Sequence, residues 1–88
     1  MTKQDLPDLL YKTIKSLGGK VVMIKIFREF WKQYSEKLKS SGDLFYTWNY
    51  DIRWAATELR KQNRMKPAST KENPKGLNTS PKGIWEII

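Results

Sequence analysis

Apolar residues recur at helical spacing in the first twenty positions of the chain. Steps of four, four and three residues place one apolar stripe on a helix, made of Leu6, Leu10, Ile14 and Leu17. We expect this helix to begin near Pro7, because proline is preorganised for the first helical turn. The pair Gly18 and Gly19 predicts its end, since glycine readily adopts the left-handed conformation found there.

A second and stronger helical pattern runs over residues 23–39. With Phe27 as reference on a helical wheel, the apolar side chains within about 60° of it are Met23, Phe30, Trp31, Tyr34 and Leu38. The opposite half of the wheel is charged and carries Lys25, Arg28, Glu29, Lys32 and Glu36. The short β-branched segment 20–22 before this helix predicts a strand.

The segment 44–48, LFYTW, is too short for a helix of its own, and we expect it to fold back and fill the core. Asn49 then predicts the N-cap of a third helix that runs to about Asn63. On this helix the residues expected to face the core are Ile52, Ala55, Ala56, Leu59 and Asn63. The residues expected on the polar side are Tyr50, Arg53, Trp54, Thr57 and Lys61, with Arg60 at its border.

Prolines and glycines punctuate the last third of the chain, which argues against further helix. Segments 64–66 and 83–88 predict strands, and the polar segment 69–82 between them predicts a long hairpin loop. The resulting order is helix, short strand, helix, helix, strand, loop, strand. That is the order of an α+β winged helix-turn-helix domain, with three helices, a small antiparallel sheet and a long wing loop. We therefore expect one such domain over residues 1–88.

The composition narrows the chemistry that these residues can perform. The 88 residues include no cysteine and no histidine, which excludes disulfides, thiolate zinc sites, nucleophilic triads and histidine-based acid–base catalysis. The carboxylates and lysines show no spacing typical of a catalytic site. We therefore expect a non-catalytic domain with no metal and no cofactor.

The charge favours a polyanionic partner. Seventeen basic and nine acidic residues give a formal net charge of +8, and double-stranded DNA is the commonest partner of so basic a domain. The longest apolar run, VVMI, is too short to span a membrane, and the first residues lack the apolar core of a signal peptide. These features predict a cytoplasmic protein without a membrane partner.

Four stretches of the chain resemble a known family: LPDLLYKTIKSLGGK near the start, SGDLFY, IRWAATELRKQ, and KGIWEI at the end. From about Leu6 onward the chain resembles the N-terminal winged-helix domain of Mrr-type restriction endonucleases. The resemblance implies a DNA-binding module that delivers an attached nuclease to its target in a restriction system. The chain departs from that family in two features. The loop before Lys82 is several residues longer than expected, and the 88 residues contain no nuclease motif.

In a helix-turn-helix geometry the exposed residues of the third helix lie in the major groove. Arg53 could then form a bidentate contact with guanine, and Thr57 could contact a base edge or a thymine methyl. Phosphate contacts are expected from Arg60, Lys61 and Arg64, whereas Tyr50 is expected on the same exposed side of the helix as Arg53 and Thr57. The wing is expected to contact the backbone or the minor groove through Lys71, Lys75 and Lys82.

Several alternatives remain open from the sequence alone. The polar side of the third helix could be an ordinary solvated face, and Trp54 could belong either to the core or to the surface. A stand-alone transcriptional regulator, acting as a homodimer, would use the same DNA chemistry. A protein–protein interaction module would instead use the basic surface to bind an acidic partner.

Overall fold

A computed structural model describes residues 1–67 and 83–88, which form an α+β fold with three helices and a small antiparallel sheet. The elements are the 3-10 helix η1 (Lys3–Asp5), α1 (Leu6–Ser16), β1 (Lys20–Val22), α2 (Met23–Lys39), α3 (Leu44–Lys61) and β2 (Ile84–Glu86). None of the helices in these two ranges has the length and apolar character needed to cross a membrane.

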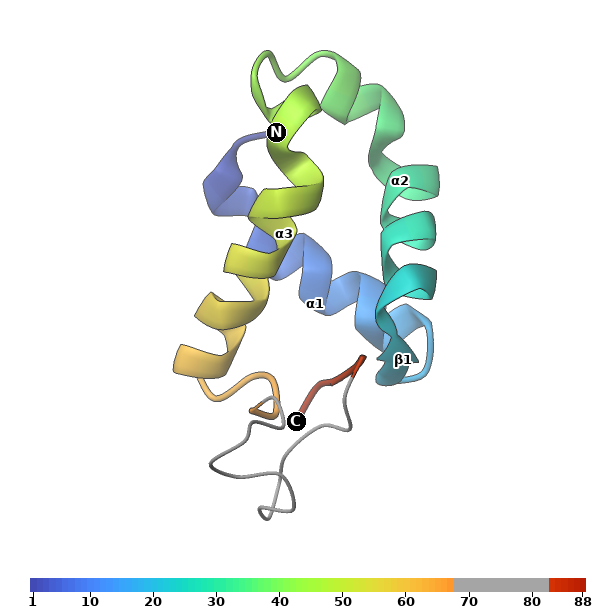
Figure 1. The fold of residues 1–88 in the computed structure, drawn as a ribbon, viewed down its shortest axis with the longest axis vertical. Helices are drawn as coiled ribbons and strands as arrows, with labels where there is room; N and C mark the ends of the chain where they lie inside the picture. Colours follow the sequence, from blue (N-terminus) through green and yellow to red (C-terminus); the bar gives the residue numbers. More distant parts are fainter. Residues whose placement is uncertain (68–82) are drawn as a thin grey trace.

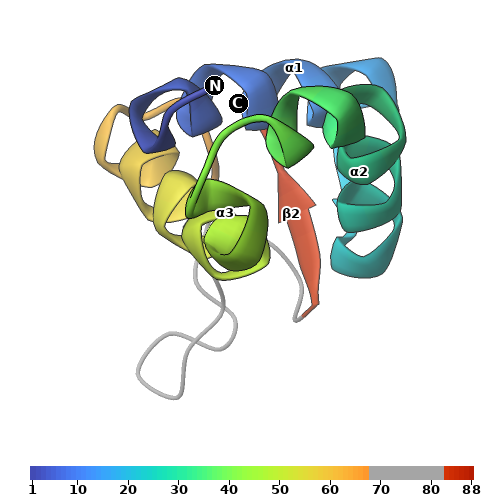
Figure 2. The ribbon, with the colours of Figure 1, turned by 90° about the horizontal axis from the view of Figure 1, so that it is seen from above.

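The three helices enclose the core from three sides. In Figure 1, α2 and α3 run along the long axis of the molecule and α1 crosses behind them. Figure 2 shows the same arrangement from above, with β2 between α2 and α3. The most extensive contact between helices joins α1 and α3, whereas α2 meets each of the other two over a smaller area.

The prediction for the first helix is confirmed. Pro7 lies in the first turn of α1, and the apolar residues Leu6, Leu10 and Ile14 are fully buried. The chain leaves the helix through Gly18 and Gly19, whose φ angles are +106° and +88°. The amide of Gly19 donates to the carbonyl of Ile14 at 2.9 Å, which satisfies one of the free carbonyls at the end of the helix.

The sheet joins the segment between α1 and α2 to the C-terminal segment of the chain. β1 and β2 pair antiparallel in the register Lys20 to Glu86, Val21 to Trp85 and Val22 to Ile84. The predicted strand 64–66 is reduced to one antiparallel bridge, between Met65 and Ile87. The C-terminal segment therefore lies between β1 and the segment that follows α3, and Trp85 of β2 is buried in the core.

The prediction for the start of the third helix is wrong. Segment 44–48 is helical and forms the first turns of α3, which follows Asp43 rather than Asn49. The preceding Gly42 has φ +63°, which turns the chain sharply between α2 and α3. Only part of the aromatic segment enters the core, because Leu44 is buried while Tyr46 is 79% exposed.

The prediction for the end of the third helix also needs correction. The helix ends at Lys61, and Asn63 is exposed with φ +58°, so Asn63 does not face the core. The amide of Arg64 donates to the carbonyl of Leu59 at 2.8 Å. Asparagine tolerates the left-handed conformation better than most residues, and it therefore suits the position after a helix end.

The core contains most of the predicted apolar residues, but α2 is rotated relative to the expectation. Its fully buried side chains are Ile26, Phe30 and Leu38, whereas Phe27 is half-buried and Trp31 is 36% exposed. The wheel centred on Phe27 gave the large rings too much weight and missed Ile26. On α3 the predicted core residues Ile52, Ala55, Ala56 and Leu59 are all fully buried.

The conformation of Asn63 leads to a stability prediction. Replacing Asn63 with alanine should lower the free energy of unfolding by about 1 kcal/mol, because a β-carbon without a local polar group disfavours positive φ. Replacing it with glycine should leave stability unchanged or raise it by up to about 1 kcal/mol. Urea denaturation of both variants measures the difference, and equal stabilities would show that residue 63 is not left-handed.

Candidate nucleic-acid interface

One side of α3 is exposed along nearly its whole length. The outer face of α3, as we define it, consists of Tyr46, Tyr50, Arg53, Thr57 and Lys61, which recur at intervals of three and four residues. Tyr46 and Tyr50 are 79% and 76% exposed. Tyr46 was missed from the sequence because segment 44–48 was not expected to be helical.

Arg53 lies in the middle of this face. Its guanidinium carbon is 5.7 Å from the centre of the Phe27 ring of α2, and it forms no ion pair with any residue in the described ranges. The hydroxyl of Thr57 donates to the carbonyl of Arg53 at 3.3 Å. A cation without a carboxylate partner can bind an anion without first breaking an ion pair.

Lys61 closes the outer face at the end of α3. Its Nζ lies 3.4 Å from Oε1 of Glu58, one turn earlier on the same helix. The lysine side chain is largely exposed, and ion pairs of this kind contribute little to stability. Lys61 can therefore exchange this partner for a phosphate at small cost.

Arg60 is turned away from solvent. Its Nε donates to the carbonyl of Lys66 at 3.4 Å, and its guanidinium carbon lies 6.0 Å from the Trp85 ring. Burial lowers the pKa of Arg60 from its ordinary value, although an arginine remains charged at neutral pH. Arg60 thus connects the end of α3 to the segment before residue 68 and to β2.

Arg64 points toward α1. Its Nη1 lies 2.7 Å from Oδ1 of Asp8 and 3.3 Å from Oε1 of Gln62, and its guanidinium carbon is 4.4 Å from the Tyr11 ring. The structure therefore brings Tyr50, Arg53, Thr57 and Lys61 together on one face and directs Arg60 and Arg64 to other neighbours. The remaining predicted residues, Lys71, Lys75 and Lys82, lie outside the described ranges.

Trp54 occupies a position between core and surface. It is half-buried and packs against the core, and Nζ of Lys3 lies 4.6 Å from the centre of its ring. The same lysine lies 4.0 Å from Oδ1 of Asp51. Trp54 therefore faces η1 rather than the outer face of α3.

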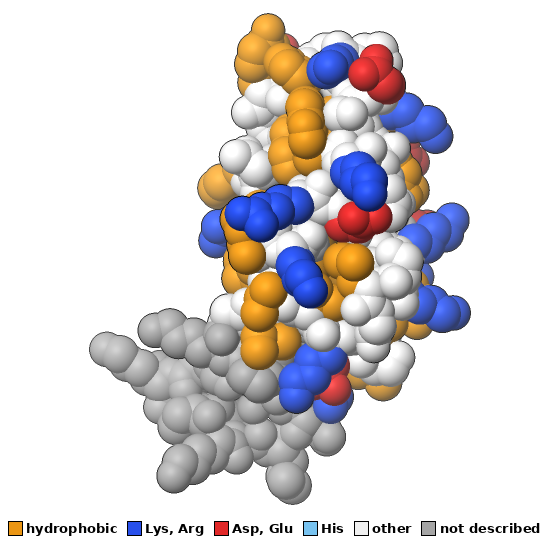
Figure 3. All heavy atoms as spheres, turned by 90° about the vertical axis from the view of Figure 1, so that its right-hand side faces the viewer, with side chains coloured by type: hydrophobic (Ala, Val, Ile, Leu, Met, Phe, Trp, Pro, Cys, Tyr) orange, Lys and Arg blue, Asp and Glu red, His pale blue; other side chains and the backbone are white. Residues whose placement is uncertain are grey.

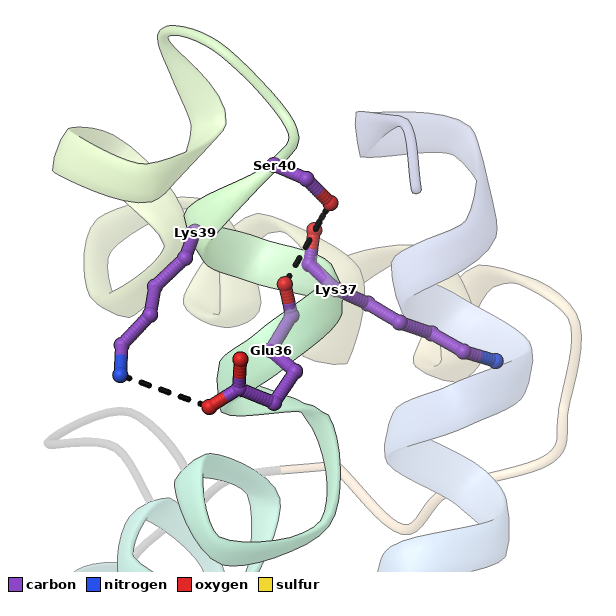
Figure 4. Close-up of polar contacts among 4 residues, drawn as sticks. All are labelled: Glu36, Lys37, Lys39 and Ser40. Atoms are coloured by element: carbon purple, nitrogen blue, oxygen red, sulfur yellow. Dashed lines mark hydrogen bonds and ion pairs between the residues drawn. The ribbon is translucent and has the colours of Figure 1, made fainter.

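A recess of about 560 Å³ lies elsewhere, lined by Met1, Asp5, Asp8, Leu9, Lys12, Lys37 and Ser40. Figure 4 shows Lys37 extending from the end of α2 toward α1, while the hydroxyl of Ser40 donates to the carbonyls of Glu36 and Lys37 at 3.3 and 3.1 Å. The amide of Thr2 donates to the carboxylate of Asp5 and lowers the pKa of that carboxyl. These polar groups cap helix ends, and charges of both signs line the recess.

Arg60 has a hydrogen bond that Arg53 lacks and should therefore contribute more to the stability of the fold. Arg60→Ala should lower the free energy of unfolding by about 1–2 kcal/mol, because it removes the hydrogen bond to the carbonyl of Lys66 and the contact of the guanidinium with the Trp85 ring. Arg53→Ala, the matched loss of one arginine, should lower it by no more than about 0.5–1 kcal/mol, the value of its contact with the Phe27 ring. Urea denaturation compares them, and equal effects would contradict the structural role of Arg60.

The chain has no match among protein-family models, curated proteins or solved structures. The resemblance to Mrr-type endonucleases therefore stays a prediction from the quoted sequence stretches.

Proposed function

We propose that the chain is a winged helix-turn-helix module that binds double-stranded DNA and has no catalytic activity of its own. In this proposal α3 enters the major groove with its outer face toward the bases. The basic segment 69–82, which lies outside the described residues, acts as the wing on the backbone or in the minor groove. The restriction-system role, in which the module targets a nuclease, is part of the same proposal and comes from the family resemblance.

The order and pairing of the elements support this fold assignment. A winged helix has a strand after its first helix and two further strands after its third, with the wing between them. Here β1 follows α1 and pairs with β2, and Met65, after α3, forms a bridge to Ile87, the residue after β2. The two connections that define the topology, α2 to α3 and Met65 to β2, are therefore compatible with a winged helix.

The observation that carries the functional proposal is the outer face of α3. Its inner side is anchored by four fully buried residues, Ile52, Ala55, Ala56 and Leu59, so the helix is held rigidly. Its outer side presents an exposed arginine and an exposed threonine one turn apart, with a lysine at the end. Arginine recognises guanine and threonine contacts thymine or a base edge, and both can do so from a helix in the major groove.

The net charge supports binding to a polyanion and gives a quantitative prediction. Affinity for a random-sequence duplex should fall steeply with salt, with a slope of about −4 to −6 in a log–log plot if about five to seven phosphates are neutralised. Fluorescence anisotropy over a series of salt concentrations measures this slope. Absence of binding at low salt, or affinity that does not change with salt, would contradict DNA binding.

The separate roles of Arg53 and Lys61 give a second prediction. Arg53→Lys keeps the charge but loses the bidentate fork, so it should reduce base discrimination by about 1–3 kcal/mol at one position of the site. Lys61→Ala should weaken binding to all sequences about equally, because phosphate contacts carry no sequence information. Selection from a randomised duplex library, followed by sequencing, measures both preferences. An unchanged preference for Arg53→Lys would exclude Arg53 from base recognition.

A further inference from the structure

Aromatic side chains fill the space between α2 and α3. The aromatic seam, as we define it, consists of Phe27, Phe30 and Trp31 of α2 with Phe45 and Trp48 of α3. The Trp48 ring centre lies 6.2, 5.7 and 5.8 Å from those of Phe27, Phe30 and Trp31, and Phe45 lies 6.3 Å from Trp31. α2 and α3 are therefore connected through contacts between aromatic rings.

The seam continues onto the surface. Trp31 is 36% exposed and Ile24, two turns earlier on α2, is 58% exposed. At the other end Phe45 packs edge-to-face on the exposed Tyr46, with 5.0 Å between ring centres. Figure 3 shows a streak of hydrophobic side chains along this face of the molecule. Contiguous exposed apolar side chains on a small domain mark an interaction surface.

The orientation of the rings disfavours nucleic acid as the occupant of this surface. Trp48 stacks on both Phe30 and Trp31, with interplanar angles of 13° and 17° and ring centres 5.7 and 5.8 Å apart. The Trp48 ring is therefore already engaged by neighbouring rings, whereas binding of a nucleobase requires a free aromatic face. The seam presents mainly ring edges and aliphatic atoms, which suit the apolar side chains of a protein.

The charges beside the seam indicate what kind of protein would bind to it. Of the five exposed cations of α2, Arg28 lies one turn from both Ile24 and Trp31, and Lys25, Lys32 and Lys39 follow on the solvent side, whereas Lys37 extends toward α1 (Figure 4). Nζ of Lys39 is 6.0 Å from the Trp31 ring centre, and Arg53 borders the seam from α3 over Phe27. The exposed carboxylate on this side of α2, Glu36, is already paired with Lys39 at 3.5 Å. A second copy of the chain would bring the same cations against this surface, whereas an acidic partner would complement them.

We propose that the aromatic seam is a docking surface for an acidic amphipathic segment of another protein. An amphipathic helix with apolar residues spaced three and four apart would place them on Ile24, Trp31 and Phe45. Its carboxylates would then lie near the cations of α2. This surface differs from the outer face of α3, and the inference does not rest on DNA binding.

A synthetic peptide tests the proposal directly. The probe is a glutamate-rich helical peptide with leucine and phenylalanine on one face, and the control peptide has the same composition with the apolar residues scrambled. Binding of the probe should shift the indole NMR signals of Trp31 and Trp48 and leave that of Trp54 unchanged, because Trp54 faces η1. The scrambled peptide should leave all of these signals in place.

Charge reversal on α2 provides the matched variants. Arg28→Glu with Lys32→Glu should weaken binding of the probe at least about tenfold, because both side chains are exposed and their change should leave the fold intact. Lys12→Glu with Lys15→Glu on α1 changes the net charge equally and should alter affinity less than about twofold. Analytical ultracentrifugation of the free protein should show a monomer.

Each of the following results would overturn the proposal. They are the absence of any shift with the probe, binding of the scrambled peptide as tight as that of the probe, and equal weakening of binding by the two double variants. Tighter binding of a single-stranded oligonucleotide at the same indole signals would assign the surface to nucleic acid. Self-association that shifts Trp31 and Trp48 would assign it to a second copy of the chain.

Discussion

The close approach of α3 to α1 is the contact on which the rest of the structure depends. Ala55 and Ala56 are fully buried on α3, and side chains this small allow two helix axes to approach closely. Their neighbours Ile52 and Leu59 extend the same buried side. Because α3 is committed to α1 on this side, its opposite side must face away from the core. The exposure of Tyr50, Arg53 and Thr57 is therefore a consequence of the burial of the opposite side of α3.

The distance between α2 and α3 is set differently. Large rings, above all Phe30 and Trp48, separate these helices, and a domain of this size cannot cover all of its large rings completely. Phe30 is fully buried, but Trp31 at the next position along α2 remains partly exposed. Small residues at one helix contact and large residues at the other thus produce both the outer face of α3 and the aromatic seam.

Two arginines that were expected to contact DNA hold the end of α3 in place. Arg60 reaches the carbonyl of Lys66 and the ring of Trp85, and Arg64 reaches Asp8 of α1. The sheet and α1 are therefore both connected to the last turn of α3. A helix held at its end and along its inner side loses little conformational entropy when its outer face binds a ligand, which favours recognition by a preorganised surface.

Most of the element order could be predicted because it depends on local signals. The limits of α2 follow from its periodicity, and the end of α1 follows from Gly18 and Gly19. The start of α3 was missed because the aromatic run 44–48 was judged by its length alone. A usable signal was present, since Leu44, Trp48, Ile52, Ala55 and Leu59 continue one helical stripe through Asn49.

The partners of the site residues could not be predicted in the same way. Asp8 and Arg64 are 56 residues apart, and their contact depends on how α3 crosses α1. The pairing of Arg60 with Lys66 likewise depends on the left-handed turn at Asn63. Sequence periodicity distinguishes exposed from buried positions on one helix, but it does not identify the neighbouring element that an exposed side chain will contact.

The two proposed surfaces share Tyr46 and Arg53 at their border, but each also has side chains of its own. Thr57 and Lys61 lie on the outer face of α3, whereas Arg28, Trp31 and Lys32 lie on α2, and Arg53 borders both. A charge change on α2 therefore tests the aromatic seam without altering the residues expected to contact bases. The guanidinium of Arg53 rests over Phe27 and must leave this ring to reach a base. Its cation–π contact is worth about 0.5–1 kcal/mol at an exposed site, which a bidentate contact to guanine exceeds.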